Sequence, residues 1–240
     1  MSKIFKLIII AMMITAVPVG ATVTTFYPVA GDNSPIDGSY DNDLATWALA
    51  HDTATASYVE DGSNVQIRVG AEKISAVRWI VTRMRTDFDT SIIGAGSTIT
   101  AAEWGGKTYS DFTTTNVVDT VNVVAHTITD LDTINTTDMD YNNWGTTSFG
   151  SIAISTITTD ETFYPITLSI FTGINKTGLT KLGLRFGKDI DNVDPAAGRS
   201  FWGIHSADTT GTASDPYLTV TYSAPGADVQ PEQDVIILDE

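Results

Sequence analysis

Acidic side chains gather in two segments of the chain and are the residues best suited to chemistry. The first segment also contains Gly31, Gly38 and Asn42, and the second contains Asn192, so both have the composition of turns. Calcium takes about six to eight oxygen ligands from carboxylates, amides and carbonyls on a bendable loop. The sequence therefore predicts calcium as a cofactor, with Asp32, Asp37, Asp41 and Asp43 of the first segment and Asp189, Asp191 and Asp194 of the second as candidate ligands. Neither segment has EF-hand spacing, and a solvated loop is the alternative interpretation.

Five tryptophans suggest a second kind of chemistry, because flat aromatic rings can pack on the apolar faces of sugar rings. Trp104 and Trp144 are flanked by Gly or Asn, which favours exposed loop positions, and Trp202 follows Arg199 near the second acidic segment. We therefore take Trp104, Trp144, Trp202 and Arg199 as candidate ligand-binding residues. The alternative is that these rings fill the core of a large β-sandwich, as we expect for Trp79 in the most apolar segment.

Residue types that carry out catalysis are scarce. The chain has no Cys, which excludes thiol catalysis, disulfides and zinc sites built on Cys. The three histidines are scattered, and no nucleophile-elbow sequence is present. A glycosidase needs two carboxylates at a fixed separation, one with a raised pKa, yet Glu is rare before the tail. The sequence therefore predicts a protein that is not an enzyme.

The charge of the chain excludes a further class of partner. Its 240 residues include 29 Asp and Glu against 13 Lys and Arg, so the net charge is -16. This charge repels phosphate backbones, and no stripe of basic residues opposes it, so nucleic acid is not expected as a partner.

Residues 1–21 have the pattern of a secretory signal peptide. Lys3 and Lys6 form a basic start, an apolar run covers 7–17, and Val19-Gly20-Ala21 resembles a cleavage site. The run is about half as long as a transmembrane helix, so we expect contact with a membrane only through an uncleaved leader. The protein is therefore predicted to be secreted and to act outside the cell or on its surface.

Residues 22–223 read as one all-β domain. Thr is abundant, which favours strands, and no apolar pattern of helical period exceeds two turns. Eight segments with β-type apolar patterns are separated by Gly, Asp, Asn, Ser and Pro clusters, and they cover 65–69, 74–84, 117–124, 127–129, 152–157, 164–170, 179–186 and 218–222. The prediction is a jelly-roll-type antiparallel β-sandwich of two sheets, with at most two short helices, near 43–50 and 170–175.

One stretch resembles a known family. Residues 83–92 (RMRTDFDTSI), followed by AGSTITAA at 95–102, are similar to a stretch of secreted jelly-roll modules that include DNRLRE-type domains and related carbohydrate-binding modules. Two late segments, 178–185 and 215–222, resemble the closing strands of that pattern, whereas 103–106 departs from it. The resemblance implies the fold rather than an activity. Related modules occur in polysaccharide-associated, cell-surface and environmental phage proteins.

The same stretch has a mechanical interpretation. Phe88 is expected to point into the core at the end of a strand, while Asp89 and Ser91 cap the following turn by accepting hydrogen bonds from backbone N–H groups. Ile99 is then expected to begin the next strand.

Residues 224–240 are predicted to be a linker and tail. A break at Pro225-Gly226 and a polar run precede the four apolar residues Val235–Leu238. These four residues have no local partner, so they are a candidate donor strand for self-assembly. The function we expect is binding of polysaccharide or a cell-surface glycan, assisted by calcium. The alternative is a structural subunit of an extracellular filament, surface layer or virion assembled by strand donation.

Overall fold

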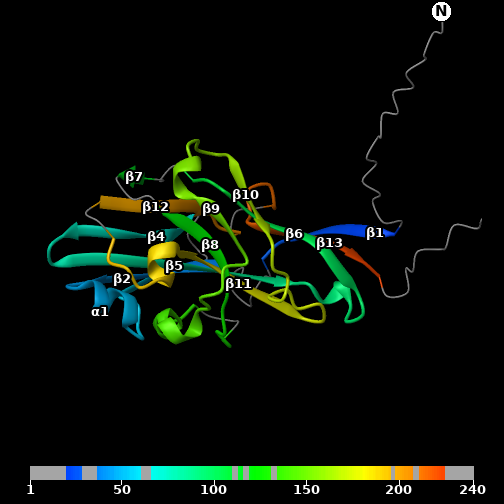
Figure 1. Ribbon diagram of the computed structural model, residues 1–240, viewed down its shortest axis with the longest axis horizontal. Helices are drawn as coiled ribbons and strands as arrows, with labels where there is room; N and C mark the ends of the chain where they lie inside the picture. Colours follow the sequence, from blue (N-terminus) through cyan, green and yellow to red (C-terminus); the bar gives the residue numbers. More distant parts are fainter. Residues whose placement is uncertain are drawn as a thin grey trace, which may run out of the picture.

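The computed structural model describes residues 20–28, 37–60, 66–109, 113–115, 119–130, 134–195, 198–207 and 211–224. Within these ranges the chain forms two antiparallel sheets, one of four strands and one of nine (Figure 1). The predicted all-β, two-sheet sandwich is therefore confirmed, while its jelly-roll connectivity stays a prediction. None of the helices in these ranges is long and apolar enough to cross a membrane.

The four-stranded sheet has the order β1-β13-β6-β10. Its strands are β1 (Ala21–Phe26), β13 (Tyr217–Ser223), β6 (Thr98–Lys107) and β10 (Phe163–Leu168). Ala21 pairs with Ser223, so the described chain begins and ends side by side at one end of the molecule (Figure 1).

The nine-stranded sheet is organised around β5 (Arg78–Asp89), which pairs with three strands. These are β2 (Asp37–Leu44), β4 (Gln66–Ser75) and β11 (Leu179–Phe186). Five strands complete the sheet: β3 (Tyr58–Glu60), β7 (Thr113–Thr115), β8 (Thr120–Ala125), β9 (Gly150–Ala153) and β12 (Gly198–His205).

Two apolar clusters cover the two faces of the large sheet. The main cluster lies between the sheets and contains residues of both, among them Phe88, Trp104, Trp202 and Leu218. The second cluster lies under a set of short helices and includes Tyr40, Trp47 and Trp144. Because both faces of β5 are covered, most of its side chains are buried.

The covering helices are short. They include α1 (Trp47–Asp52), α2 (Gly187–Ile190), and the 3-10 turns η2 (Thr136–Met139) and η3 (Tyr141–Asn143). Two further 3-10 turns are η1 (Ser91–Ile93) and η4 (Ile154–Thr156). Thr46 caps α1, with its hydroxyl accepting a hydrogen bond from Leu49 N–H at 3.2 Å.

Two expectations for the motif that carried the family resemblance are confirmed, those for Phe88 and Asp89, while a cap by the Ser91 side chain stays a prediction. Phe88 is fully buried, and the Asp89 carboxylate accepts a hydrogen bond from Ser91 N–H at 3.0 Å. Strand β6 includes Ile99, as predicted, and it continues through 103–106, where the sequence departs from the family pattern. Glycines at 105 and 106 therefore lie within a strand and not in a loop.

Five local predictions are wrong. Residues 37–43, which have the composition of a turn, form most of strand β2, and 154–156 of the predicted strand 152–157 form the turn η4. Residues 170–175 form turns rather than a helix, and the second helix is α2 instead. Residues 127–129 are not a strand, because β8 ends where His126 turns inward to Asp87. The segment 74–84 is the end of β4, a turn and the start of β5, since apolar side chains continue across the hairpin.

The short helices and the segment that carries Trp144, together called the covering layer, pack closely on the large sheet. This packing leaves no room for a side chain at Gly183 in β11. A Cβ atom there would lie 2.3 Å from the Trp144 ring and 2.7 Å from the Met84 carbonyl oxygen. We expect Gly183→Ala to lower the free energy of unfolding by about 1–3 kcal/mol, because neither the backbone nor the buried indole can move away. Urea unfolding followed by circular dichroism measures this change.

The matched control is Gly178→Ala, where the nearest atom is the exposed Asn175 amide nitrogen at 3.1 Å. That variant is expected to stay within about 0.5 kcal/mol of the original protein. Equal stability of the two alanine variants would contradict the packing of Trp144 over β11.

Candidate functional site

Trp104 and Trp202 are core residues. Both are fully buried, and their rings meet edge to face with centroids 6.0 Å apart. Their Nε1 atoms donate hydrogen bonds to the hydroxyls of Thr86 and Thr108, each at 3.2 Å. The expectation that Trp104 is exposed is therefore wrong, because strand alternation turns this side chain toward the other sheet. Gly106 gives its ring room, since a Cβ there would lie 2.8 Å from it.

Trp144 lies in the segment between η3 and β9 but is also buried, with 3 % of its surface exposed. Its ring packs over Gly183, between Tyr40 at 5.8 Å and His126 at 5.7 Å. Its Nε1 atom donates a hydrogen bond to the Asp138 carbonyl at 2.9 Å. The predicted exposure of Trp144 is wrong, because this segment folds down onto the large sheet. None of the three indoles presents a face on which a sugar ring could stack.

Arg199 lies apart from these rings. Its guanidinium lies 5.0 Å from the Phe201 ring centroid, and its Nε atom is 3.8 Å from the Glu72 carboxylate. Arg199 and Trp202 are three residues apart on β12, so they point to opposite faces of the strand. The structure does not bring them together as one site.

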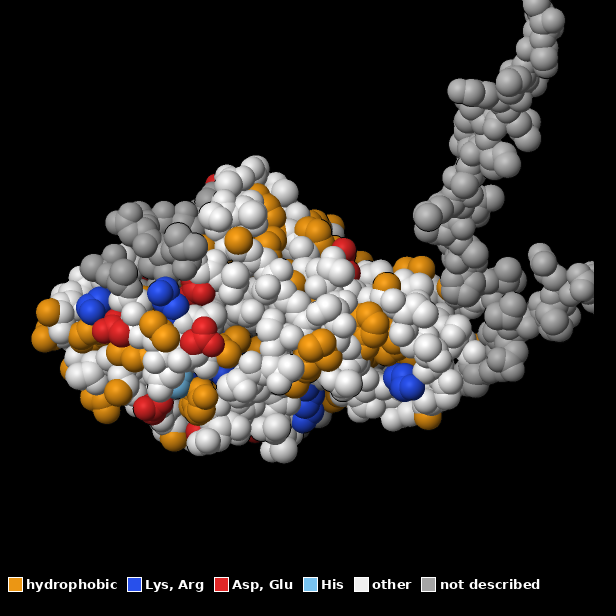
Figure 2. All heavy atoms as spheres, viewed as in Figure 1, with side chains coloured by type: hydrophobic (Ala, Val, Ile, Leu, Met, Phe, Trp, Pro, Cys, Tyr) orange, Lys and Arg blue, Asp and Glu red, His pale blue; other side chains and the backbone are white. Residues whose placement is uncertain are grey.

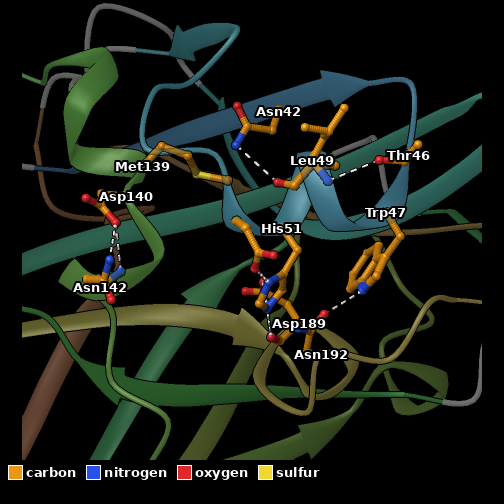
Figure 3. Close-up of polar contacts among 12 residues, drawn as sticks. Asn42, Thr46, Trp47, Leu49, His51, Met139, Asp140, Asn142, Asp189 and Asn192 are labelled. Atoms are coloured by element: carbon orange, nitrogen blue, oxygen red, sulfur yellow. Dashed lines mark hydrogen bonds and ion pairs between the residues drawn. The ribbon is translucent and has the colours of Figure 1, made fainter.

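Asp189 lies next to His51 beneath α1 (Figure 3). Its side chain is the centre of a buried ionic network. Its carboxylate accepts hydrogen bonds from Arg83 Nε and Nη2 at 2.9 and 2.6 Å, and from Arg185 Nε at 2.6 Å. The His51 ring donates a hydrogen bond from Nε2 to the backbone oxygen of Asp189 at 2.8 Å. Burial by itself raises the pKa of Asp189, but the two guanidinium groups outweigh it and hold the pKa far below its ordinary value. This residue thus serves as the counter-ion of two arginines.

A second buried ionic group lies beside the first. Asp87 accepts hydrogen bonds from Arg85 Nε and Nη2 at 3.0 and 2.8 Å, and its other oxygen is 2.7 Å from His126 Nε2. Burial lowers the pKa of His126, and Asp87 opposes that effect. The hydroxyl of Tyr40 donates to the Asp138 carboxylate at 3.2 Å, and burial raises the pKa of this phenol. Because Asp87 belongs to the family-like motif, that motif has a structural role here.

The remaining candidate calcium ligands are dispersed. The Asp37 carboxylate accepts a hydrogen bond from Ala207 N–H, Asp43 is held by Arg78, and Asp194 is held by Lys73 and the Trp79 indole. Asp41 is largely buried, which raises its pKa, and Asp191 is exposed after α2. In the part of the chain that the structure describes, no three His, Asp or Glu side chains form a group that could hold a metal. Asp32 lies outside the described residues, so the calcium site stays a prediction.

The outward face of the four-stranded sheet carries groups that the sequence analysis did not single out. Register places Thr25, Thr219, Glu103 and Thr167 in one row across its four strands. Beside this row Tyr217 lies across Gly105, where a Cβ would come within 2.3 Å of the phenol ring. The outward face therefore combines hydroxyls, one carboxylate and an aromatic ring.

Aromatic side chains and a hollow complete this face. The rings of Phe163 and Tyr217 have centroids 5.6 Å apart, and the Tyr217 hydroxyl donates a hydrogen bond to Glu103 at 2.9 Å. Tyr27 and Phe163 are 39 % and 36 % exposed. Two shallow hollows of about 380 and 230 Å³ share Glu103 and Thr219 in their walls, so they adjoin each other, and we refer to the two together as the outer groove. Burial and Glu103 raise the pKa of Tyr217 to about 12, so this phenol stays protonated and neutral.

Charge is distributed unevenly over the surface. On the face drawn in Figure 2, charged side chains gather over the end that carries α1 and β2, whereas the end with β1 and β13 is mainly uncharged. Tyr217, Thr219 and Thr221 alternate with apolar residues along β13, and this pattern in the sequence predicts that the three side chains share one outward face. Which strands would lie next to β13 was not readable from the sequence.

No protein-family model matches the chain, and a comparison with curated proteins finds no match.

Replacing Asp189 by Asn tests the buried network. Asp189→Asn keeps the shape but leaves Arg83 and Arg185 without their counter-ion, so we expect a loss of about 3–5 kcal/mol in the free energy of unfolding at pH 7. Because the pKa of Asp189 is lowered by folding, its stabilisation is present above the unfolded value of about 4 and is lost as pH falls toward the folded value. The difference between the two proteins should therefore shrink below about pH 4.

Asp191→Asn is the control, because Asp191 is exposed two residues away. Denaturant unfolding of the three proteins from pH 3 to 7 gives both results. A loss for Asp189→Asn no larger than that for Asp191→Asn would rule out the network as a major source of stability.

Proposed function

We propose that this protein is a non-catalytic extracellular module that binds polysaccharide on the outward face of its four-stranded sheet. The observation that carries the proposal is the outer groove on this face, where Tyr217 and Phe163 adjoin Glu103 and a row of threonines. Rings of this kind can pack on the apolar face of a sugar, and the carboxylate and hydroxyls can bond to its hydroxyl groups. The extracellular location rests on the signal-peptide pattern of residues 1–21, nearly all of which lie outside the described residues.

The shape of the groove favours a chain-like ligand. The two hollows extend from Tyr27 and Phe163 on one side to Thr167 and Thr221 on the other, which suits several consecutive sugar units better than one. Both hollows are open rather than enclosed, as is typical of a surface that binds part of a long polymer.

The charges around the groove favour a neutral glycan. Lys107 and Glu161 near Phe163 form an ion pair at 2.7 Å, which leaves Glu103 as the charge in the groove walls. A polymer of uronic acids would meet this carboxylate and the net charge of -16. Calcium remains a proposed cofactor through Asp32, because the described candidate ligands form no group that could hold a metal.

Substitution of Phe163 tests the proposal. Affinity electrophoresis in gels that contain soluble neutral glucans, mannans or xylans should retard the protein. Phe163→Ala removes a ring, so the dissociation constant obtained from the retardation should rise at least tenfold. Glu103→Gln removes a hydrogen-bonding charge, so it should also raise the dissociation constant. Tyr58→Ala removes a ring that is 53 % exposed on the other sheet, so it is the matched control and should bind normally.

The same samples separate glycan binding from the structural alternative. A filament or surface-layer subunit would assemble in light scattering and show no preference for any polysaccharide. Absence of retardation in every polysaccharide, or equal retardation of Phe163→Ala and the original protein, would refute the proposed site.

A further inference from the structure

A separate groove opens at the end of the four-stranded sheet where the described chain ends. It has a volume of about 540 Å³ and lies between the start of β6 and the segment 171–176. Its apolar lining comes from Ile99, Phe171 and Ile174, and its polar lining includes Thr98, Thr172 and Lys176. It shares no lining residue with the proposed glycan groove.

One wall of this groove is an open sheet edge. Strand β6 pairs with β13 from Thr98 onward, but its pairing with β10 begins only at Ala102. Within the described ranges no strand pairs with residues 98–101 on the β10 side. Four residues of this edge, 98–101, are therefore without a strand partner among the described residues on that side, and Thr98 and Ile99 of them line the groove.

We propose that the chain's own segment Val235–Leu238 docks in this groove as a short added strand. The segment lies outside the described residues, and it is four residues long, as is the open edge. Alternate side chains of an added strand point to opposite faces, so half of these apolar residues reach Ile99, Phe171 and Ile174. The other half cover the rim.

The chain length permits docking within one molecule. Ser223 is paired with Thr98, so β13 ends at the rim of the groove, one strand away from the open edge. Residues 225–234 connect Ala224 to the segment and span up to about 33 Å when extended, whereas neighbouring strands are about 4.8 Å apart. A short tether also gives a local concentration on the order of millimolar, which favours the molecule's own segment over that of another copy.

Charge supports the same occupant. Lys176 lines the groove, with its Nζ atom donating a hydrogen bond to the Ser97 carbonyl at 2.7 Å. Asp239 and Glu240 directly follow the apolar segment, so docking would bring these carboxylates toward a cation. An acidic flank next to an apolar segment suits a groove with an apolar floor and a basic rim.

The absence of Cys allows a direct test by disulfide cross-linking in the full chain. Ile237→Cys is combined either with Thr172→Cys in the groove or with Val23→Cys on β1, and each protein is oxidised at low concentration. Val23 is 64 % exposed and lies on the other side of β13. The tail that follows β13 can therefore extend to Val23 as easily as to the groove, which makes Val23→Cys the control. We expect the groove pair to cross-link within one chain at least tenfold faster than the β1 pair.

Ile236→Asp, added to the groove pair, distinguishes specific docking of the segment from random collisions of a tethered tail, because it changes the segment and leaves the tether length unchanged. A charge in the apolar segment should reduce the cross-linking rate to that of the β1 pair. Equal rates for the two original pairs, an unchanged rate with Ile236→Asp, or disulfides mainly between two chains would each overturn intramolecular docking. Glycan retardation of the Ile236→Asp protein should stay normal, so the two proposals can fail separately.

Discussion

The paired charges of Asp189, Arg83 and Arg185 tie the covering layer to the large sheet. Arg83 and Arg185 come from the two neighbouring strands β5 and β11, and Asp189 comes from α2, directly after β11. Arg83 also donates hydrogen bonds to the backbone oxygens of Met139 and His51, at 2.7 and 2.9 Å. One guanidinium thus connects the sheet with η2, α1 and α2. Loss of the contact between Arg83 and Asp189 would lower the free energy of unfolding by several kcal/mol, because it would leave a buried charge without its partner.

Among the described residues, this layer covers one face of the large sheet around β5. Arg83, Arg85 and Asp87 alternate along β5 with Met84, Thr86 and Phe88, so one face carries charges and the other belongs to the main core. A charged face can be buried only when each charge has a partner. Asp189 of α2 is the partner of Arg83, whereas Arg85 and Asp87 of β5 pair with each other.

The four-stranded sheet has a different character. Its inner face supplies Trp104, Ile166 and Leu218 to the main core, while its outer face carries threonines, Glu103 and aromatic rings. Both ends of the described chain belong to this sheet, and the groove beside β6 opens at the same end. A glycan on the outer face and a tail segment at the edge would use different surfaces of the sheet. The two proposals are therefore compatible with each other.

The sequence by itself determined the fold class and several local features of the chain. Alternating apolar residues and turn clusters depend on neighbours in sequence, so most strands, the burial of Phe88 and the Asp89 turn could be predicted. The tertiary structure decided which polar and aromatic residues meet. Trp104 and Trp144 sit beside glycines that suggested loops, yet Gly106 and Gly183 are the positions that admit these rings into the core. Asp189 looked like a calcium ligand, but strands more than a hundred residues apart bring Arg83 to it, and pairing at that distance is not encoded in local spacing. The same holds for the outer groove, because Tyr217, Glu103 and Phe163 become neighbours only through the register of β13, β6 and β10.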